Sequence, residues 1–211
     1  MLNICLDPDK LEAGIDEAGR GPLFGRVYTA AVILPHDDFD HSLIKDSKKL
    51  SENKRLELFD YIKDYAIDWS VCFKDEKHID NNNILQSNIE SMHDCLNNLI
   101  VKPDHILVDG NYFKTYQCPD GNYISHTTVV KGDDKYTSIA AASILAKVSR
   151  DTYIKELCEK YPKLDEFYGL KSNKGYGSKK HMTGIKTYGI SPWHRKSFGR
   201  CQFESVNSVF T

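Results

Sequence analysis

Four acidic residues stand at positions that suit metal-ion chemistry. Asp16 and Glu17 precede a glycine-rich stretch, Asp109 follows the apolar run HILV, and Asp133 follows the run VVKG. Each position is one where the pattern predicts a strand end or a helix start, and α/β proteins build their sites at such strand ends. Carboxylate oxygens suit Mg²⁺ or Mn²⁺, and two divalent ions would balance about four negative charges. The spacing therefore indicates a site for two-metal displacement at phosphorus; the alternative is that these residues are solvated or, like Asp133, cap a helix.

The adjacent pair Asp16 and Glu17 places a condition on this site. Neighbouring residues in a regular strand face opposite sides of the sheet, so both side chains reach one site only if the strand twists or breaks at Glu17. The glycines and the proline of the following GRGP sequence would supply such a break. We therefore expect the strand to lose its regular geometry at Glu17.

A basic segment at 167–203 gives a second indication of chemistry with phosphates. It contains eight Lys and Arg residues and no Asp or Glu, although the whole chain has a net charge of −2. Four aromatic residues, among them Tyr176, are interleaved with these cations. Cations that meet phosphates and rings that stack on bases or sugars are typical of nucleic-acid binding. The alternative is a solvated basic face that balances an acidic body.

Composition excludes several classes of protein. A chain of 211 residues with 40% hydrophobic and 27% charged residues predicts a globular fold, and no apolar run is long enough to span a bilayer. The N-terminal sequence has no signal-peptide layout, and the six cysteines include no C-x-x-C pair, which argues against zinc and predicts reduced thiols in the cytoplasm. The stretch GRGPLFG does not match the dinucleotide-binding pattern, and no G-x-x-x-x-G-K-[ST] loop is present.

A mixed α/β scaffold is predicted to position these residues. Hydrophobic periodicity predicts strands at 13–18, 26–34, 67–73, 105–108 and 127–130, and helices after Ser51, at 83–100 and at 137–160. The last helix begins with small residues, including Ala140 and Ser143, which let a helix backbone approach a sheet closely. A helical, basic C-terminal portion completes the predicted fold.

Seven sequence blocks, in order, resemble the motif series of ribonuclease HII, the bacterial type 2 ribonuclease H. They are AGIDEAGRGPLFGRVYTAAVIL, DSKKLS, NILQSNIESM, ILVDGN, VVKGDDKYTSIAAASILAKVSRD, KGYGSKKH and SPWHRKSF, and they span 13–198. The resemblance implies a ribonuclease H-like mixed β-sheet flanked by helices at 1–160, with a C-terminal helical, basic substrate-binding segment at 161–211. It also implies a metal-dependent endoribonuclease that cleaves the RNA strand of RNA–DNA hybrids and incises 5′ to single ribonucleotides in duplex DNA. Such an enzyme would leave a 5′-phosphate and would support ribonucleotide excision repair and RNA primer removal.

The resemblance further implies roles for individual residues. The metal-binding acids of the family match Asp16, Glu17, Asp109 and Asp133, which would hold two Mg²⁺ or Mn²⁺ ions during catalysis. The GRG motif matches Gly19, Arg20 and Gly21, and its backbone would approach the 2′-hydroxyl at the RNA–DNA junction. The junction-sensing tyrosine matches Tyr176, and Ser47, Lys48 and Lys49 of DSKKLS would lie along the phosphate backbone. A cytoplasmic monomer without accessory subunits is expected.

Some questions stay open at this level. Phe24 and Arg26 depart from the small residue and proline that the family usually has beside GRG. His181, His194 and Arg195 either contact phosphate or tie the C-terminal segment to the rest of the chain. Two rival functions remain: a nucleic-acid-binding module without chemistry, which would gain nothing from the acidic quartet, and a related metal-dependent nuclease such as ribonuclease HIII or a resolvase-like enzyme, which GRG together with Tyr176 disfavours.

Overall fold

The structure is a computed structural model that describes residues 2–45 and 47–210, with every side chain in these ranges except that of Lys48. It divides into two compact units. Unit 1 comprises Met1–Ala18, Tyr28–Phe73 and Asn88–Val148, and unit 2 comprises Gly19–Val27, Lys74–Ser87 and Ser149–Thr211. Unit 2 therefore contains the basic C-terminal segment together with two stretches from earlier in the chain, one of which carries the GRG motif.

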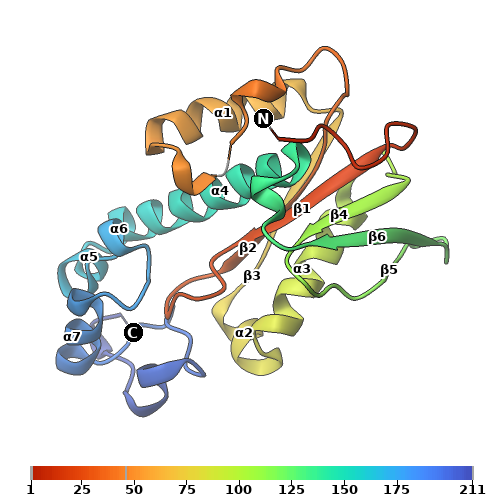
Figure 1. Ribbon diagram of the computed structural model, residues 1–211. Helices are drawn as coiled ribbons and strands as arrows, with labels where there is room; N and C mark the ends of the chain where they lie inside the picture. Colours follow the sequence, from red (N-terminus) through yellow and green to blue (C-terminus); the bar gives the residue numbers. More distant parts are fainter. Residues whose placement is uncertain (1, 46, 211) are drawn as a thin grey trace. The chain divides into compact units, whose positions relative to one another are not determined.

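Unit 1 is built on a six-stranded mixed sheet with the strand order β3-β2-β1-β4-β6-β5 (Figure 1). Its strands are β1 (Glu12–Ala18), β2 (Val27–Ile33), β3 (Asp68–Lys74), β4 (His105–Asp109), β5 (Tyr116–Gln117) and β6 (Tyr123–Val129). The central strand β1 pairs antiparallel with β2 and parallel with β4, and β4 pairs parallel with β6. The predicted mixed sheet is confirmed.

Helices cover both faces of this sheet (Figure 1). Helix α1 (Glu52–Tyr65) and the first half of α4 (Thr137–Lys160) pack on one face, and α3 (Ile84–Asn98) packs on the other. The strands alternate between the two cores: Ile15 packs with the α3 side, whereas Ala18 packs with the α4 side. This alternation decides which acidic side chains share a face.

Helix α4 approaches β1 unusually closely at Gly14. A Cβ atom at this position would lie 2.2 Å from the main-chain carbon of Ser138 and 2.4 Å from the main-chain nitrogen of Ile139. Only glycine leaves room for the helix there. The close approach places the first turns of α4, including Ser143, against the strand that carries Asp16.

The boundaries of two helices agree with the prediction from the sequence. α4 has the predicted bounds, and the side chain of Ser51 caps α1 by accepting a hydrogen bond from the Lys54 amide at 3.3 Å. The helix predicted at 83–100 is preceded by a separate helix, α2 (Glu76–Asn82), and Asn83 has a φ of 64° between the two. A left-handed residue ends one helix and lets the next begin in a new direction.

Unit 2 is mainly helical. Besides α2 it contains α5 (Lys163–Tyr168), α6 (Leu170–Asn173), α7 (Lys179–Tyr188) and the short 3₁₀ turns η4 (Gly199–Phe203) and η5 (Ser208–Phe210). Its own core includes Phe24, Ile154, Leu164, Tyr168 and Ile185. Among the described residues, no helix is long and apolar enough to cross a membrane.

Candidate active site

Asp16 and Asp109 share the face of the sheet that α4 covers. Asp16 lies on β1 in alternation with Ile15, and Asp109 ends the neighbouring parallel strand β4. Burial, and then the neighbouring charges of Glu17 and Asp109, raise the pKa of Asp16 well above its usual value. A buried carboxylate whose pKa is raised by neighbouring carboxylates is a common signature of a functional site.

Strand β1 keeps its regular geometry at Glu17, contrary to the predicted break there. The antiparallel ladder between β1 and β2 continues through Glu17, opposite Thr29, to Ala18, opposite Tyr28. The strand therefore does not break at Glu17, because the glycines follow only after the last ladder pair. Regular alternation assigns Glu17 to the face opposite Asp16, although its charge is near enough to affect Asp16.

The main chain before α4 fixes Asp109 and places Asp133 beside it. The amide of Gly132 donates a hydrogen bond of 2.6 Å to Oδ1 of Asp109. Gly132 opens the 3₁₀ turn η3 (Gly132–Asp134), in which Asp133 is buried. A Cβ at Gly132 would lie 3.3 Å from the same carboxylate oxygen and 2.6 Å from Ile139, so glycine is required for this contact. The turn therefore brings Asp133 next to Asp109 in unit 1.

Two serines form a polar support behind Asp16. Ser143 on α4 hydrogen-bonds the Asp16 carboxylate, which partly offsets the rise in its pKa. The Oγ atoms of Ser143 and Ser47 are 3.0 Å apart, and Ser47 is only 3% exposed. Ser47 was predicted to lie along phosphate, but its hydroxyl faces inward, toward Ser143. Sequence reasoning missed this pair because 96 residues separate the two serines.

Of the two lysines in DSKKLS, the structure describes the side chain of Lys49. Lys49 is exposed and forms an ion pair with Asp134, the residue after Asp133. The predicted phosphate contact of Lys48 lies outside the described side chains. Lys49 thus keeps its charge at the surface of unit 1, near the turn that carries Asp133.

The carboxylate oxygens of this site suit a hard divalent cation, although the side chains are not close enough together to enclose one. Within residues 2–45 and 47–210, no three His, Cys, Asp or Glu side chains converge closely enough to hold a metal ion. Asp16 nevertheless lies within electrostatic range of Glu17 and Asp109, and all its near acidic neighbours are hard oxygen donors. A cation between them would relieve the repulsion that raises the pKa of Asp16.

Unit 2 brings the GRG motif and Tyr176 together. Gly19 has a φ of 97°, and Arg20 and Gly21 are exposed. A Cβ at Gly21 would lie 3.7 Å from Cε1 of Tyr176, whose side chain is half exposed. The amide of Leu23 donates a 2.9 Å hydrogen bond to the carbonyl of Gly175, which joins the two loops. The predicted junction residues are therefore neighbours on one accessible surface.

Buried polar residues of the SPWHR sequence and of α7 settle one open alternative. Arg195 and His181 are 0% exposed and His194 is 1% exposed, so none of them contacts phosphate at the surface in this structure. Their hydrogen bonds lead instead to the GRG loop and to Tyr176. Phe24, one of the departures from the family pattern, is buried with its ring edge-on to His194 at 5.1 Å. These residues tie the C-terminal segment to the loop at 19–27.

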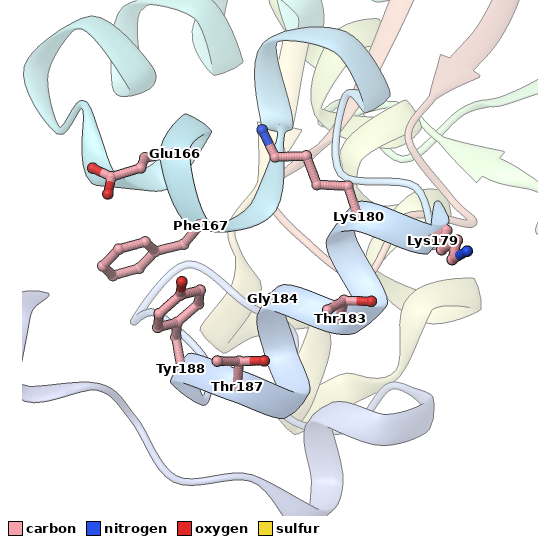
Figure 2. A pocket seen from close by; sticks show the side chains of 8 residues that line it. All are labelled: Glu166, Phe167, Lys179, Lys180, Thr183, Gly184, Thr187 and Tyr188. Atoms are coloured by element: carbon pink, nitrogen blue, oxygen red, sulfur yellow. The ribbon is translucent and has the colours of Figure 1, made fainter.

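A hollow of about 570 Å³ lies between α5 and α7 in unit 2 (Figure 2). Lys179, Lys180, Thr183 and Thr187 line it together with the stacked rings of Phe167 and Tyr188, which are 4.1 Å apart. Figure 2 shows these polar side chains projecting from α7, with the ring of Phe167 beside that of Tyr188. Ammonium and hydroxyl donors beside rings are groups that contact a nucleic-acid backbone.

Known proteins place this architecture in a family. The model of the ribonuclease HII family matches residues 13–206. Ribonuclease HII of Phocaeicola vulgatus is 49% identical over 198 residues, which are 94% of both chains. The solved ribonuclease H2 of Pyrococcus horikoshii OT3 is 30% identical with a TM-score of 0.73, covering 90% of this chain and 95% of that one. Archaeoglobus fulgidus RNase HII, solved in a complex with PCNA, is 27% identical with a TM-score of 0.67 and the same coverage.

These similarities span nearly the whole chain and confirm the resemblance in its sequence blocks as well as the ribonuclease H-like fold. The family consists of metal-dependent endoribonucleases that act on RNA–DNA hybrids. The chain belongs to the ribonuclease HII family.

Proposed function

We propose that the chain incises duplex DNA on the 5′ side of a single embedded ribonucleotide, hydrolyses the RNA strand of RNA–DNA hybrids, and leaves a 5′-phosphate. Ribonucleotide excision repair and RNA primer removal are the processes this activity would serve, in the cytoplasm. The observation that carries the cleavage step is the buried carboxylate Asp16, whose pKa is raised by burial and by Glu17 and Asp109. A fold gains no stability from buried like charges, whereas a cation site needs them.

Four carboxylates would hold the metal ions: Asp16, Glu17, Asp109 and Asp133. Mg²⁺ or Mn²⁺ suits this oxygen-only donor set, and two ions are expected. Held by these residues, such ions would supply activation of a water molecule and charge stabilisation of the leaving 3′-oxygen. Glu17 has one methylene more than an aspartate, and this length would let it reach around the end of β1 from the opposite face.

The protein's own groups orient these carboxylates. The hydroxyl of Ser143 holds one oxygen of Asp16, and the amide of Gly132 holds Oδ1 of Asp109 at 2.6 Å. The amide of Glu17 also donates to Oδ1 of Asp16, at 2.6 Å. Asp133 lies in the turn η3 just before α4, so the start of that helix determines where its carboxylate stands. Preformed orientation of this kind reduces the cost of assembling the site on each turnover.

Recognition of the ribonucleotide is assigned to unit 2. The 2′-hydroxyl is the group that distinguishes RNA from DNA at one nucleotide. The amides of Arg20 and Gly21 would meet it, since both residues are exposed and Gly21 has no side chain that could cover them. Tyr176 would stack on the neighbouring deoxyribose, where an additional 2′-hydroxyl is unfavourable, and would thereby read the RNA–DNA junction.

Contacts with the rest of the duplex are assigned to basic residues. Lys49, and Lys48 next to it, would meet the phosphate backbone, and Lys179 and Lys180 beside the α7 hollow would meet a further part of it. We propose that the chain works as a monomer without accessory subunits; the complex with PCNA is a property of the archaeal relative.

A cleavage assay with three duplexes of one sequence tests this proposal. One duplex contains a single ribonucleotide, one is an RNA–DNA hybrid, and one is DNA only, and each is incubated with the protein and Mg²⁺. We expect cleavage of the first two, with the first cut only on the 5′ side of the ribonucleotide. Cleavage of the hybrid without cleavage of the single-ribonucleotide duplex would refute the junction-reading part. Binding of all three without any cleavage would leave a binding module.

A further inference from the structure

The two elements that are proposed to read the ribonucleotide rest on buried polar side chains of unit 2, among them His194 and Arg195 in the segment 191–195. We propose that Arg195 and the His194–His181 pair are positioning residues for this recognition: Arg195 fixes the main chain of the 19–25 loop, and the histidines fix the main chain at Tyr176. This inference rests on the proposed function, since it concerns how these elements are held for a substrate. All three side chains are buried, so they act through the loops rather than by contact with nucleic acid.

Arg195 is the centre around which the 19–25 loop is folded. Its guanidinium donates to four main-chain carbonyls: Nε to Gly25 at 2.8 Å, Nη1 to Pro22 at 2.8 Å and to Arg20 at 3.0 Å, and Nη2 to Gly19 at 2.6 Å. Its own amide donates to the Leu23 carbonyl at 2.9 Å. Only a guanidinium offers this many donors in a fixed plane, so lysine is not an equivalent residue here.

The direction of these carbonyls fixes the direction of the amides that face the substrate. The chain has no cis peptide bonds among its described residues, and in a planar trans peptide the C=O and the N–H point in opposite directions. The carbonyls of Gly19 and Arg20 point inward at Arg195. The amides that share their peptide planes, those of Arg20 and Gly21, therefore point outward, on residues that are exposed. Arg195 thereby aims two N–H groups at the position proposed for the 2′-hydroxyl.

The histidine pair holds Tyr176 through a chain of hydrogen bonds with one possible direction. The Ser191 amide donates to Nδ1 of His194 at 2.9 Å, so this nitrogen carries no proton. The proton of neutral His194 is then on Nε2, which donates to Nε2 of His181 at 3.0 Å. His181 in turn carries its proton on Nδ1 and donates it to the Tyr176 carbonyl at 2.9 Å. The main chain of Tyr176 is held from inside while its ring stays half exposed.

Further buried bonds join the two loops into one arrangement. Arg150 donates to the carbonyls of Phe24 and Lys174, each at 3.0 Å, and the Gly25 amide donates to the Trp193 carbonyl at 2.9 Å. The spacing between the Gly21 amide and the Tyr176 ring is therefore set by the protein before any substrate binds. Preorganised donors lose less conformational entropy on binding than donors that must first be ordered.

Binding without cleavage separates positioning from general structure. Fluorescence anisotropy in EDTA compares a duplex with one ribonucleotide and the same duplex in DNA only, and the ratio of the two Kd values is the preference for the 2′-hydroxyl. Arg195→Lys should lower this preference about fivefold, the worth of one ordinary hydrogen bond, with little change in the Kd for DNA. The matched control is Arg55→Lys, because Arg55 also donates to two main-chain carbonyls, of Ser47 and Leu50, but in unit 1. Its preference should stay at the wild-type value.

The histidines are tested through their dependence on Tyr176. His194→Leu should lower the preference in the wild-type chain but not in a Tyr176→Ala chain, and His194→Gln, which retains a donor, should recover part of it. Circular dichroism and urea unfolding select the variants that fold. If folded Arg195→Lys and His194→Leu keep the wild-type preference, or if His194→Leu has the same effect without Tyr176, the inference is overturned. A wild-type chain without preference and without cleavage would instead refute the proposed function itself.

Discussion

The substitution Gly14→Ala tests how closely α4 packs on the strand that carries Asp16. The added Cβ would lie 2.2, 2.4 and 2.5 Å from main-chain atoms of Ser138 and Ile139. Ordinary carbon contacts are about 3.5–4.0 Å, so the first turns of α4 would have to recede by about 1.3 Å. These atoms belong to a buried helix backbone and have no flexible end that can turn aside.

The expected cost is at the upper end of the range for overpacking, about 3 kcal/mol in the free energy of unfolding. For a chain of this size that corresponds to a fall in Tm of roughly 6–12 °C. A displaced helix start would also move Asp133 and Ser143 relative to Asp16. We therefore expect at least about a tenfold loss of kcat at a temperature where the variant is folded.

Urea unfolding followed by circular dichroism measures the first effect, and cleavage of an RNA–DNA hybrid measures the second. Gly177→Ala is the matched control, because a Cβ there meets nothing nearer than Sδ of Met182 at 3.6 Å and its φ is not positive. Alanine in place of glycine reduces the conformational entropy of the unfolded chain, so this control should be neutral or stabilised by up to about 1 kcal/mol. A Gly14→Ala chain that unfolds within about 0.5 kcal/mol of the wild type would refute the close packing of α4 on β1.

Three further predictions concern recognition, pH and the support of the carboxylates. Tyr176→Ala should reduce cleavage of the single-ribonucleotide duplex about tenfold more than cleavage of a hybrid, since stacking on one nucleotide is lost; an equal loss on both would make the ring structural. Burial lowers the pKa of His181 and His194, so near pH 6.5 the unfolded chain binds protons that the folded chain does not. The free energy of unfolding should therefore fall as the pH falls from 7 toward 5.5, by up to about 1.4 kcal/mol per pH unit for each histidine. Urea melts that do not depend on pH in this window would contradict the neutral pair. Ser143→Ala should lower kcat about tenfold by releasing Asp16, and a kcat within about twofold of the wild type would show that this hydroxyl does not orient it.

Local patterns predicted most of the sheet and its helices. Alternation and apolar runs located β1, β2, β3 and β4, and the bounds predicted for α4 are those of the structure. The pattern failed where a single residue redirects the chain, as at Asn83 with its φ of 64°, and where a strand is as short as β5. Such features depend on backbone conformation and tertiary pairing, which leave little periodicity to detect.

The arrangement of the candidate site was likewise predicted from the sequence only in part. The four acidic residues were predicted from their places at strand ends or helix starts, but the regular ladder through Glu17 was not predicted, since the glycines that follow suggested an earlier break. The side of the chain to which a polar residue turns is also invisible in the sequence. Ser47 and Arg195 are residue types that often contact phosphate at a protein surface, yet both are buried and form hydrogen bonds with groups distant along the chain. Only the assembled core decides between these alternatives.

The most direct test of the central claim is the cleavage of a single-ribonucleotide duplex by the wild type and by Asp109→Asn, in Mg²⁺. This substitution keeps an oxygen for the Gly132 amide but removes the charge that would hold a cation. Asp120→Asn is the control, since Asp120 is an exposed aspartate in the turn before β6. The account predicts that the wild type and Asp120→Asn cut on the 5′ side of the ribonucleotide and that folded Asp109→Asn is slower by at least about 100-fold. An Asp109→Asn chain as active as the wild type would contradict it.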